Sequence, residues 1–228
     1  DVLGSRGLGD VYKRQVRMRY YNADGGEAEM CGNGARCFSN FAAALLHHDK
    51  TTPLPFETMA GVVTATFEKD GNVTVNLTNP HSMQLFVLNA DPTVGADVHF
   101  LNTGVPHAVA FLDKLEGLDI SRLGAYLRYH EAFSPKGTNA NFARILSPGH
   151  IAIRTYERGV EDETLACGTG MTACALLHAV LTDAPSPIQV DVAGGDTLKV
   201  GFQRTGDRFT DVTLTGPADL VFTGDIQI

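Results

Sequence analysis

One short arrangement occurs twice in the chain, and it constrains the fold more than any other feature. Cys-Gly-Asn-Gly begins at Cys31 and Cys-Gly-Thr-Gly begins at Cys167, and an apolar stretch of helical periodicity follows each copy. A strand-like segment and a loop precede each copy, so the same order of elements occurs in both halves. We interpret this order as a duplication of architecture, in which each half is built around a helix that begins at a cysteine.

Apolar periodicity predicts the elements around the two motifs. Helices are predicted over Asn33–His47 and Met171–Leu181, and the second is apolar on nearly all sides, which is typical of a buried helix. A surface helix is predicted over Ile120–Phe133. Strands are predicted over Met18–Asn22, Phe56–Glu68, Asn72–Thr78, His107–Leu112, Ile151–Gly159, Ile188–Gly195, Asp196–Gln203, Asp211–Gly216 and Leu220–Ile228.

The length and the element order set the domain organisation. The chain has 228 residues, which suits one large or two small domains with real cores. We predict an α/β fold of the α+β type with two pseudo-symmetric domains, one over residues 1–70 with 216–228 and one over 71–215. Residues 1–15 show neither strand alternation nor a capped helix, so we interpret them as unrelated sequence joined to a truncated natural N-terminus.

Charge and composition exclude several classes of protein. The formal net charge of −8 argues against nucleic-acid binding, which usually needs a basic surface. No apolar run has the length of a membrane span and no charged-then-apolar leader is present, so a soluble cytoplasmic protein is expected. The four cysteines lack the close pairs of a zinc site, and no metal is expected.

The start of a helix explains what the two motifs can do. Its first backbone N–H groups have no intrahelical partner and its dipole is positive there, which favours a thiolate or a substrate carboxylate. A helix N-terminus also lowers the pKa of a cysteine thiol. The glycines of the motifs, which are Gly32, Gly34, Gly168 and Gly170, allow unusual backbone angles and leave the N–H groups open to a ligand.

The four cysteines therefore receive two different interpretations. Cys37 and Cys174 lie inside the predicted helices and are expected to be small core residues. Cys31 and Cys167 lie at the helix starts and are the candidate reactive thiols. Nucleophilic catalysis would need an activating base, commonly a histidine. Two equivalent thiols favour a symmetric reaction, in which a thiolate removes a proton from a carbon and a thiol returns one from the opposite face, as in racemisation or epimerisation.

The segments NADGGEAEMCGNGARC (Asn22–Cys37) and YERGVEDETLACGTG (Tyr156–Gly170) resemble the two signature segments of the diaminopimelate epimerase family. The resemblance extends from about Arg17 to the end of the chain and includes LTGPADLVFTGDI (Leu214–Ile226). It implies two domains, each a mixed, curled β-sheet around a central helix, with the active site between them. It also implies a cytoplasmic homodimer that interconverts LL- and meso-diaminopimelate, for lysine and peptidoglycan biosynthesis, without PLP or metal.

The resemblance assigns roles to individual residues. Cys31 and Cys167 match the acid/base pair. His107 matches a histidine near the cysteines, and we interpret it as a residue that does not contact the substrate and that influences the pKa of a thiol. The positions that match substrate-binding residues are Gly32, Asn33, Gly168 and Thr169 for the carboxylate at the reacting carbon, Glu157 for the ammonium group, and Asn22, Asn139 and Arg158 for the distal amino-acid end.

Three features depart from the family pattern. The Gly-x-Gly-Asn-Asp-Phe segment near the family's N-terminus is absent, and so is a further site residue before the first motif. Val105 replaces the usual Asn of Gly-Asn-Pro-His, so a distal contact is lost or supplied by Thr103. The loop between Glu157 and Cys167 is longer than is typical, and we expect it to bulge.

Other functions remain open at this point. Proline racemase and hydroxyproline epimerase share the two-cysteine logic, but their first motif reads Cys-Gly-His and their substrates lack a distal amino-acid end. The phenazine-biosynthesis-like isomerases share the fold but lack the paired cysteines. The chain could also be a catalytically incomplete fragment that only binds an amino acid, or a thiol redox sensor. Its partner in every enzymatic interpretation is a small molecule, not a nucleic acid or a membrane.

Overall fold

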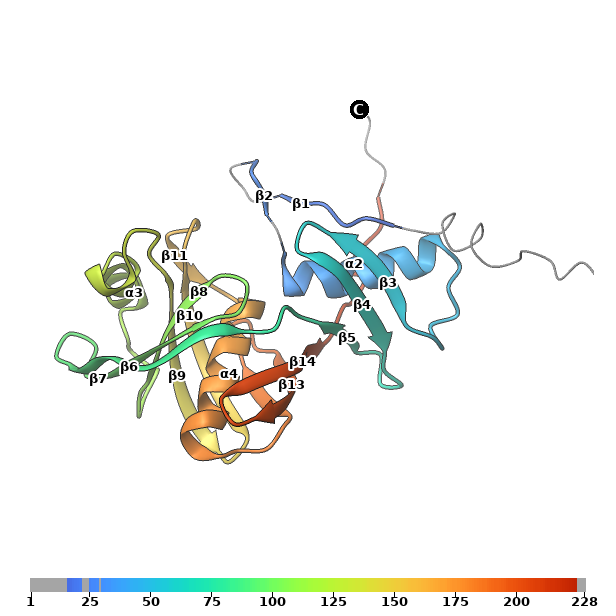
Figure 1. The fold of residues 1–228 in the computed structure, drawn as a ribbon. Helices are drawn as coiled ribbons and strands as arrows, with labels where there is room; N and C mark the ends of the chain where they lie inside the picture. The colour runs from blue at the N-terminus through green and yellow to red at the C-terminus, as the bar shows by residue number, and fades with distance from the viewer. Residues whose placement is uncertain (1–15, 22–24, 29, 225–228) are drawn as a thin grey trace, which may run out of the picture. The chain divides into compact units, whose positions relative to one another are not determined.

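The computed structural model describes residues 16–21, 25–28 and 30–224, and these form two compact units (Figure 1). One unit comprises Asp1–Val75 with Gly216–Ile228, and the other comprises Asn76–Thr215. Each contains a β-sheet and a helix that begins at one of the cysteine motifs. The predicted α+β class is therefore confirmed.

The first unit is a small antiparallel sheet with one helix. Its elements are β1 (Tyr20–Tyr21), β2 (Glu27–Ala28), α2 (Gly32–Leu45), β3 (Leu54–Thr58), β4 (Gly61–Phe67) and β5 (Val73–Asn76). The strands β3, β4 and β5 are paired in that order, and β1 pairs with β2. Residues 16–18 run beside β3, where Met18 N donates to Glu57 O at 2.9 Å. Small side chains on α2 form the core of this unit with Leu54.

The second unit is a larger mixed sheet with two helices. Its elements are β6 (His81–Asp91), β7 (Ala96–Asn102), β8 (Pro106–Phe111), α3 (Ile120–Arg128), the 3-10 helix η1 (Glu131–Phe133), β9 (Asn139–Ser147), β10 (His150–Glu157), β11 (Asp162–Thr164), α4 (Gly168–Thr182), β12 (Ile188–Asp191), β13 (Thr197–Thr205) and β14 (Arg208–Gly216). The strand order is β14-β13-β12-β10-β9-β8-β7-β6, with β11 added beside β10. The pairs β8–β9 and β10–β12 are parallel, and the others are antiparallel.

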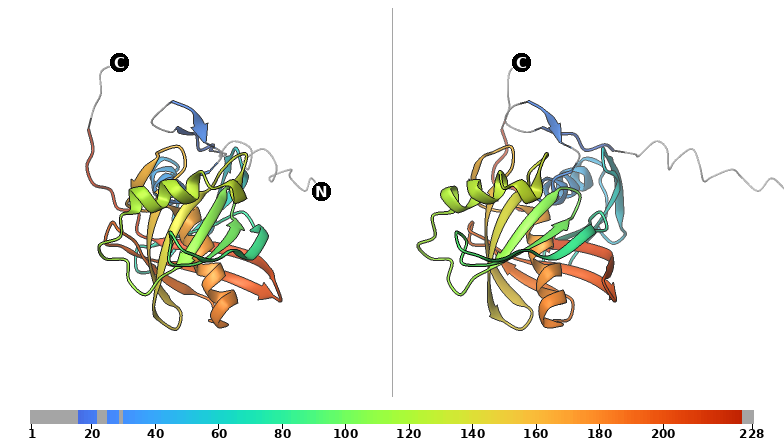
Figure 2. Two further views of the ribbon diagram at one scale, coloured as in Figure 1. Left: turned by 90° about the vertical axis from the view of Figure 1, so that its left-hand side faces the viewer. Right: turned by 60° about the vertical axis from the view of Figure 1, so that its left-hand side comes forward.

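The two helices of this unit cover opposite faces of its strands (Figures 1 and 2). The sheet wraps around α4, which contacts strands β7 to β10, β12 and β13. Residues on every side of α4 are buried, as its nearly uniform apolar sequence predicts. On the other face, α3 packs its apolar stripe, which includes Leu123 and Leu127, against Phe142 and Tyr156. The sheet therefore has α4 on one face and the apolar cluster beneath α3 on the other.

Several sequence predictions differ from the structure. The helix predicted over Ile120–Phe133 ends at Arg128, because His130 has an extended backbone and its side chain accepts from Ala132 N to begin η1. No strand is present over 217–224, although Leu220–Ile228 was expected to form one, and Leu220, Val221 and Phe222 are 80–87% exposed. A strand needs a pairing partner as well as β-forming residues, and this segment pairs with none of the described strands. The remainder of that prediction lies outside the described residues.

Helix α2 also differs from expectation in the face that it buries. Phe41 and Leu45 point outward and are 63% and 61% exposed, whereas Phe38 packs against the core, and the fully buried positions carry small or hydrogen-bonded side chains. Ser39 Oγ donates to Ala35 O at 2.6 Å, which satisfies a buried hydroxyl. The apolar period was detected correctly, but it does not identify the buried side of this helix.

Candidate active site

Cys31 is the N-cap residue of α2. Its backbone is extended, with φ −138° and ψ 114°, and Ala35 N donates to its carbonyl at 2.8 Å as the first helical hydrogen bond. Its Sγ accepts a hydrogen bond from Gly34 N at 3.3 Å. The sulfur therefore occupies the place in which a serine or aspartate oxygen usually caps a helix, where backbone N–H groups and the helix dipole favour negative charge.

Cys167 is the N-cap residue of α4 in the same backbone conformation. Its φ is −116° and its ψ is 110°, and Met171 N donates to its carbonyl at 2.9 Å. Its Sγ lies 3.5 Å from Thr169 Oγ1, and the residue is 7% exposed. Thr103 Oγ1 donates to Thr169 O at 3.0 Å, which ties the β7–β8 loop to the start of the helix. The two motifs thus begin their helices with the same backbone conformation, but only the Cys31 side chain makes a helix-capping hydrogen bond.

The glycines of the motifs serve close packing. Gly32 and Gly168 begin the two helices, and none of the four motif glycines has a positive φ, so the expectation of unusual backbone angles is wrong. A Cβ on Gly34 would approach the Cβ of its own cysteine at 3.4 Å. A Cβ on Gly170 would overlap Asn141 Oδ1 and lie 3.3 Å from Cys167 Sγ. Asn141 Oδ1 therefore excludes a side chain at Gly170, whereas a Cβ at Gly34 would meet only close contacts.

The other two cysteines lie in different environments. Cys174 is completely buried, and burial raises the pKa of its thiol far above the usual range, so the expectation of a core residue is confirmed. Cys37 is exposed, so the same expectation is wrong for this residue. It lies on the outer side of α2, whose buried positions are other residues of the helix. Hydrophobic periodicity did not distinguish these two cases.

Polar side chains gather on the face of the sheet that α4 covers. Strand pairing aligns His107 with Asn139 and aligns Asn141 with Thr155, and side chains of paired residues lie on the same face. Glu157 follows Thr155 at a spacing of two residues and belongs to the same face. Residues between them, such as Tyr156, pack beneath α3 on the other face. The alternation of the strands therefore assembles a polar surface beside the Cys167 motif.

His107 is fully buried within this polar face. Burial lowers the pKa of its imidazole from 6.5 to about 3, and the nearby positive charge of Arg158 acts in the same direction. The ring is therefore neutral at physiological pH. Its Nδ1 lies 3.1 Å from Asn141 Nδ2, and its Nε2 is buried without a hydrogen bond to any of the described residues. The Nε2 atom of His107 is therefore a polar atom that is enclosed by the protein and has no partner among the described residues.

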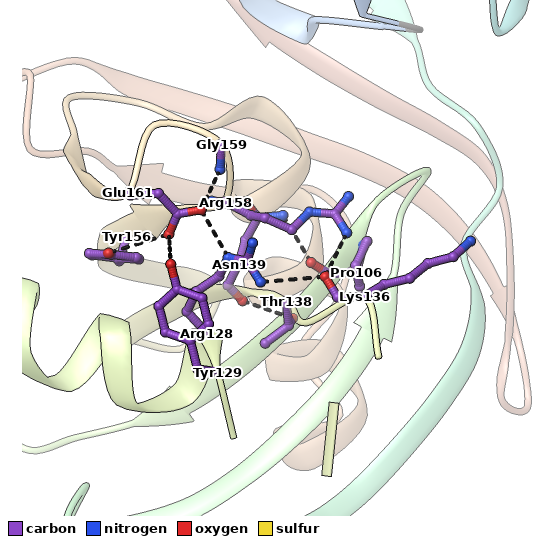
Figure 3. Close-up of polar contacts among 10 residues, drawn as sticks. All are labelled: Pro106, Arg128, Tyr129, Lys136, Thr138, Asn139, Tyr156, Arg158, Gly159 and Glu161. Carbon is purple, nitrogen blue, oxygen red and sulfur yellow. Dashed lines mark hydrogen bonds and ion pairs between the residues drawn. The ribbon is translucent and has the colours of Figure 1, made fainter. Parts of the chain in front are cut away.

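Asn139 and Arg158 are joined through the main chain (Figure 3). Asn139 Nδ2 donates to Pro106 O at 2.9 Å and its Oδ1 accepts from Arg158 N at 2.8 Å. The Arg158 side chain donates through Nη1 to Lys136 O at 3.3 Å. Burial lowers the pKa of its guanidinium, and the charge of Arg128 adds to this effect. Asn139 thus fixes the backbone that carries Arg158.

Glu161 is a hydrogen-bonding centre that the sequence did not identify (Figure 3). Its carboxylate accepts from Arg128 Nε at 3.2 Å, Tyr129 Oη at 3.1 Å and Gly159 N at 3.0 Å. The backbone of Glu161 has φ 59°, and its N–H donates to Glu157 O at 2.8 Å. The longer loop after Glu157 is therefore a compact turn that this carboxylate holds against α3.

The remaining predicted positions are placed as follows. Glu157 is partly buried, and burial raises the pKa of its carboxyl group. Asn33 Oδ1 accepts from Arg36 Nη1 at 3.1 Å, and Arg36 Nε also donates to Pro217 O. Asn22 lies outside the described residues. The hydroxyl of Thr103, which could replace the missing contact of Val105, already donates to the α4 start.

Comparison with solved structures identifies the class of fold. A Bacillus anthracis phenazine biosynthesis protein of the PhzF family aligns with a TM-score of 0.66 and 14% sequence identity, over 88% of this chain and 77% of that chain. A probable proline racemase from Agrobacterium radiobacter aligns with a TM-score of 0.62 and 20% identity, over 86% of this chain and 67% of that chain. The chain therefore has the fold shared by PhzF proteins and amino-acid racemases.

Sequence relatives identify the family within this class. A diaminopimelate epimerase from Hydrogenobaculum sp. is 42% identical over 217 residues, which are 93% of this chain and 75% of that protein. One from Aquifex aeolicus is 41% identical over 220 residues, which are 96% of this chain and 77% of that protein. The diaminopimelate epimerase family model matches residues 6–83 and 99–221. The chain belongs to the diaminopimelate epimerase family and is an isomerase.

Proposed function

We propose that the protein interconverts LL- and meso-diaminopimelate with Cys31 and Cys167 as an acid/base pair. The observation that carries the proposal is that the two cysteines share one position and one backbone conformation at the start of a helix. Each is the N-cap of a helix, with the same extended backbone, and each precedes Gly-x-Gly. Epimerisation needs one group that removes a proton and another that returns one, and the two thiols supply both.

The chemistry proposed for the two thiols is proton transfer at the α-carbon. One sulfur, as a thiolate, removes the α-proton, and the other, as a thiol, donates a proton to the opposite face of the same carbon. The roles exchange for the reverse reaction. The N–H groups at Gly32 with Asn33 and at Gly168 with Thr169 hold the carboxylate next to that carbon, because helix starts bind anions. These fixed donors stabilise the charge that develops as the proton leaves.

We propose that the remaining polar residues recognise the ends of the substrate. Glu157 pairs with the ammonium group at the reacting end, and Arg158, Asn139 and Asn22 recognise the distal end. An arginine suits a carboxylate because its guanidinium donates two parallel hydrogen bonds. Support comes from the hydrogen bond of 2.8 Å that Arg158 N donates to Asn139 Oδ1, which holds the backbone that carries the Arg158 side chain. Diaminopimelate has an amino-acid group at each end and proline has only one, so residues that bind a distal end favour diaminopimelate. The similarity to the probable proline racemase supports only the fold.

We also propose that the enzyme is a cytoplasmic homodimer that acts in lysine and peptidoglycan biosynthesis. The support is the family membership and the acidic net charge of −8, which suits a small-molecule enzyme and not a nucleic-acid-binding protein. Among the described residues, none of the helices is long and apolar enough to cross a membrane. The family resemblance implies no cofactor.

Deuterium exchange tests the proposal directly. The purified chain is incubated with LL-diaminopimelate in heavy water, and the α-proton signal and the meso product are followed by NMR. We expect exchange and epimerisation in the wild type, and loss of epimerisation in Cys31→Ser and in Cys167→Ser. Cys37→Ser is the matched control, because its thiol is exposed on the outer side of α2. It should retain activity.

Two outcomes would contradict the proposal. A folded chain that binds diaminopimelate but exchanges no α-proton would support the alternative of an amino-acid-binding protein. Epimerisation that survives both serine substitutions would exclude the two-thiol mechanism. The same assay with proline tests the racemase alternative, for which exchange on proline and none on diaminopimelate is the expected result.

A further inference from the structure

Asn141 is a completely buried residue whose side chain joins three strands. It lies in β9, and its exposed fraction is 0%. Its Oδ1 accepts from Thr155 Oγ1 of β10 at 3.0 Å. Its Nδ2 lies 3.0 Å from Ala108 O and 3.1 Å from His107 Nδ1, both in β8. All of its polar atoms are therefore used within the sheet, beside the start of α4.

The partners of Asn141 determine which of its atoms is nitrogen. A backbone carbonyl such as Ala108 O only accepts hydrogen bonds, so the amide atom that faces it must be the NH₂ group. The second hydrogen of the same NH₂ group is directed to His107 Nδ1, which must then be an acceptor. A neutral imidazole with an acceptor at Nδ1 carries its proton on Nε2.

The consequence is a buried donor. The Nε2 of His107 is inaccessible and makes no hydrogen bond to the described residues. A buried N–H without a partner costs about 1–3 kcal/mol, so its retention calls for an explanation. Asn141, which contacts the His107 ring, lies near the cysteine, because its Oδ1 occupies the space of a Cβ on Gly170, and that Cβ position is 3.3 Å from Cys167 Sγ.

We propose that Asn141 is a positioning residue that fixes His107 as the Nε2–H tautomer and so provides a neutral donor within the polar face of the sheet that α4 covers. Asn141 touches neither the substrate nor the transferred proton in this scheme; it acts through His107. That this donor serves epimerisation rests on the proposed function. The tautomer itself does not, since it follows from Ala108 O and the amide of Asn141 alone.

The substitution Asn141→Asp reverses the polarity of the contact at almost unchanged volume. A carboxylate can only accept, so His107 would move its proton to Nδ1 or become charged. We therefore expect a change of tautomer or a raised pKa of His107, and a loss of kcat of at least about tenfold, within the range for acid–base assistance. The pH dependence of kcat should gain a new ionisation.

The direct readout is the ¹⁵N–¹H multiple-bond NMR spectrum of the histidine rings, in which the two tautomers give different patterns. The His107 signals are assigned as those missing from His107→Gln. His99 is an internal reference, because its Nδ1 accepts from Phe86 N at 3.2 Å and should not respond to Asn141. For the NMR spectrum alone, Asn139→Asp is the matched control, since it adds the same charge on the same strand and face while its amide contacts Pro106 O instead of His107.

The outcomes separate this inference from the proposed function. An Nδ1–H pattern for His107 in the wild type would overturn the inference, and this measurement does not depend on whether Asn141→Asp folds. An unchanged His107 spectrum in folded Asn141→Asp would also overturn it. If the wild type shows the Nε2–H tautomer and Asn141→Asp changes it, but neither exchanges deuterium into diaminopimelate, the inference stands and the proposed function fails.

Discussion

Burial of a neutral histidine makes the stability of this protein depend on pH in a defined direction. His107 has a pKa of about 3 in the folded chain and 6.5 when it is exposed to water. The unfolded chain therefore binds more protons between these two values. The stability from the neutral ring is fully present above pH 6.5, and it is lost as the pH falls towards the folded-state pKa. Acid should thus weaken the second unit.

The magnitude follows from the two pKa values. Each pKa unit corresponds to about 1.4 kcal/mol, so lowering the pH from about 7.5 to about 4.5 should remove about 3 kcal/mol of the free energy of unfolding. His107→Gln cannot titrate at this position and should lack that part of the pH dependence. Urea unfolding of both proteins at the two pH values gives the difference. His107→Gln should be less stable than the wild type at about pH 7.5, and the difference in the free energy of unfolding between the two proteins should be smaller at about pH 4.5.

The comparison isolates one residue. Burial also lowers the pKa of His99 and His178, so the wild-type slope alone contains several contributions. The difference between wild type and His107→Gln cancels these. A gap that does not change between the two pH values would refute the reasoning, because it would mean that His107 binds protons equally in the folded and unfolded chains.

Three further results are expected. Gly170→Ala should destabilise the protein by about 1–3 kcal/mol in urea unfolding, and Gly34→Ala should do so less, because only the first introduces an overlap with a buried amide; equal effects would contradict this ranking. Iodoacetamide should label Cys37 in the native protein and leave the buried thiol of Cys174 unmodified, as read by peptide mass spectrometry, and labelling of both at equal rates would disprove it. Glu161→Gln should raise KM more than it lowers kcat, because it loosens the turn that carries the substrate-binding residues; a fall in kcat alone would indicate another role.

Features that depend on neighbouring residues could be predicted from the sequence. The N-cap positions of Cys31 and Cys167 follow from the motif and the helical period after it, and the structure has both. The burial of α4 follows from its apolar residues on all sides. Capping and periodicity act over one or two helical turns, so a single stretch of sequence contains the information.

Tertiary structure decided which residues meet. His107, Asn141 and Thr155 come from three strands, and their contacts depend on the pairing order and register of the sheet, which no local pattern encodes. No strand was predicted over Asn139–Ser147, so the common face of the Asn139 and Asn141 amides became apparent only in the structure. In the sequence, Glu161 is an ordinary loop carboxylate, and only the structure shows that the turn brings it into contact with Arg128 of α3.

The same reason explains the predictions that were wrong. Cys37 and Cys174 both lie on predicted helices rich in apolar residues, yet one is exposed and the other is completely buried, because burial depends on which strands surround each helix. The segment after Gly216 has β-forming residues but, up to residue 224, no strand to pair with. Sequence sets what each segment can form, and long-range packing selects the side that is buried, because burial is a property of the surroundings.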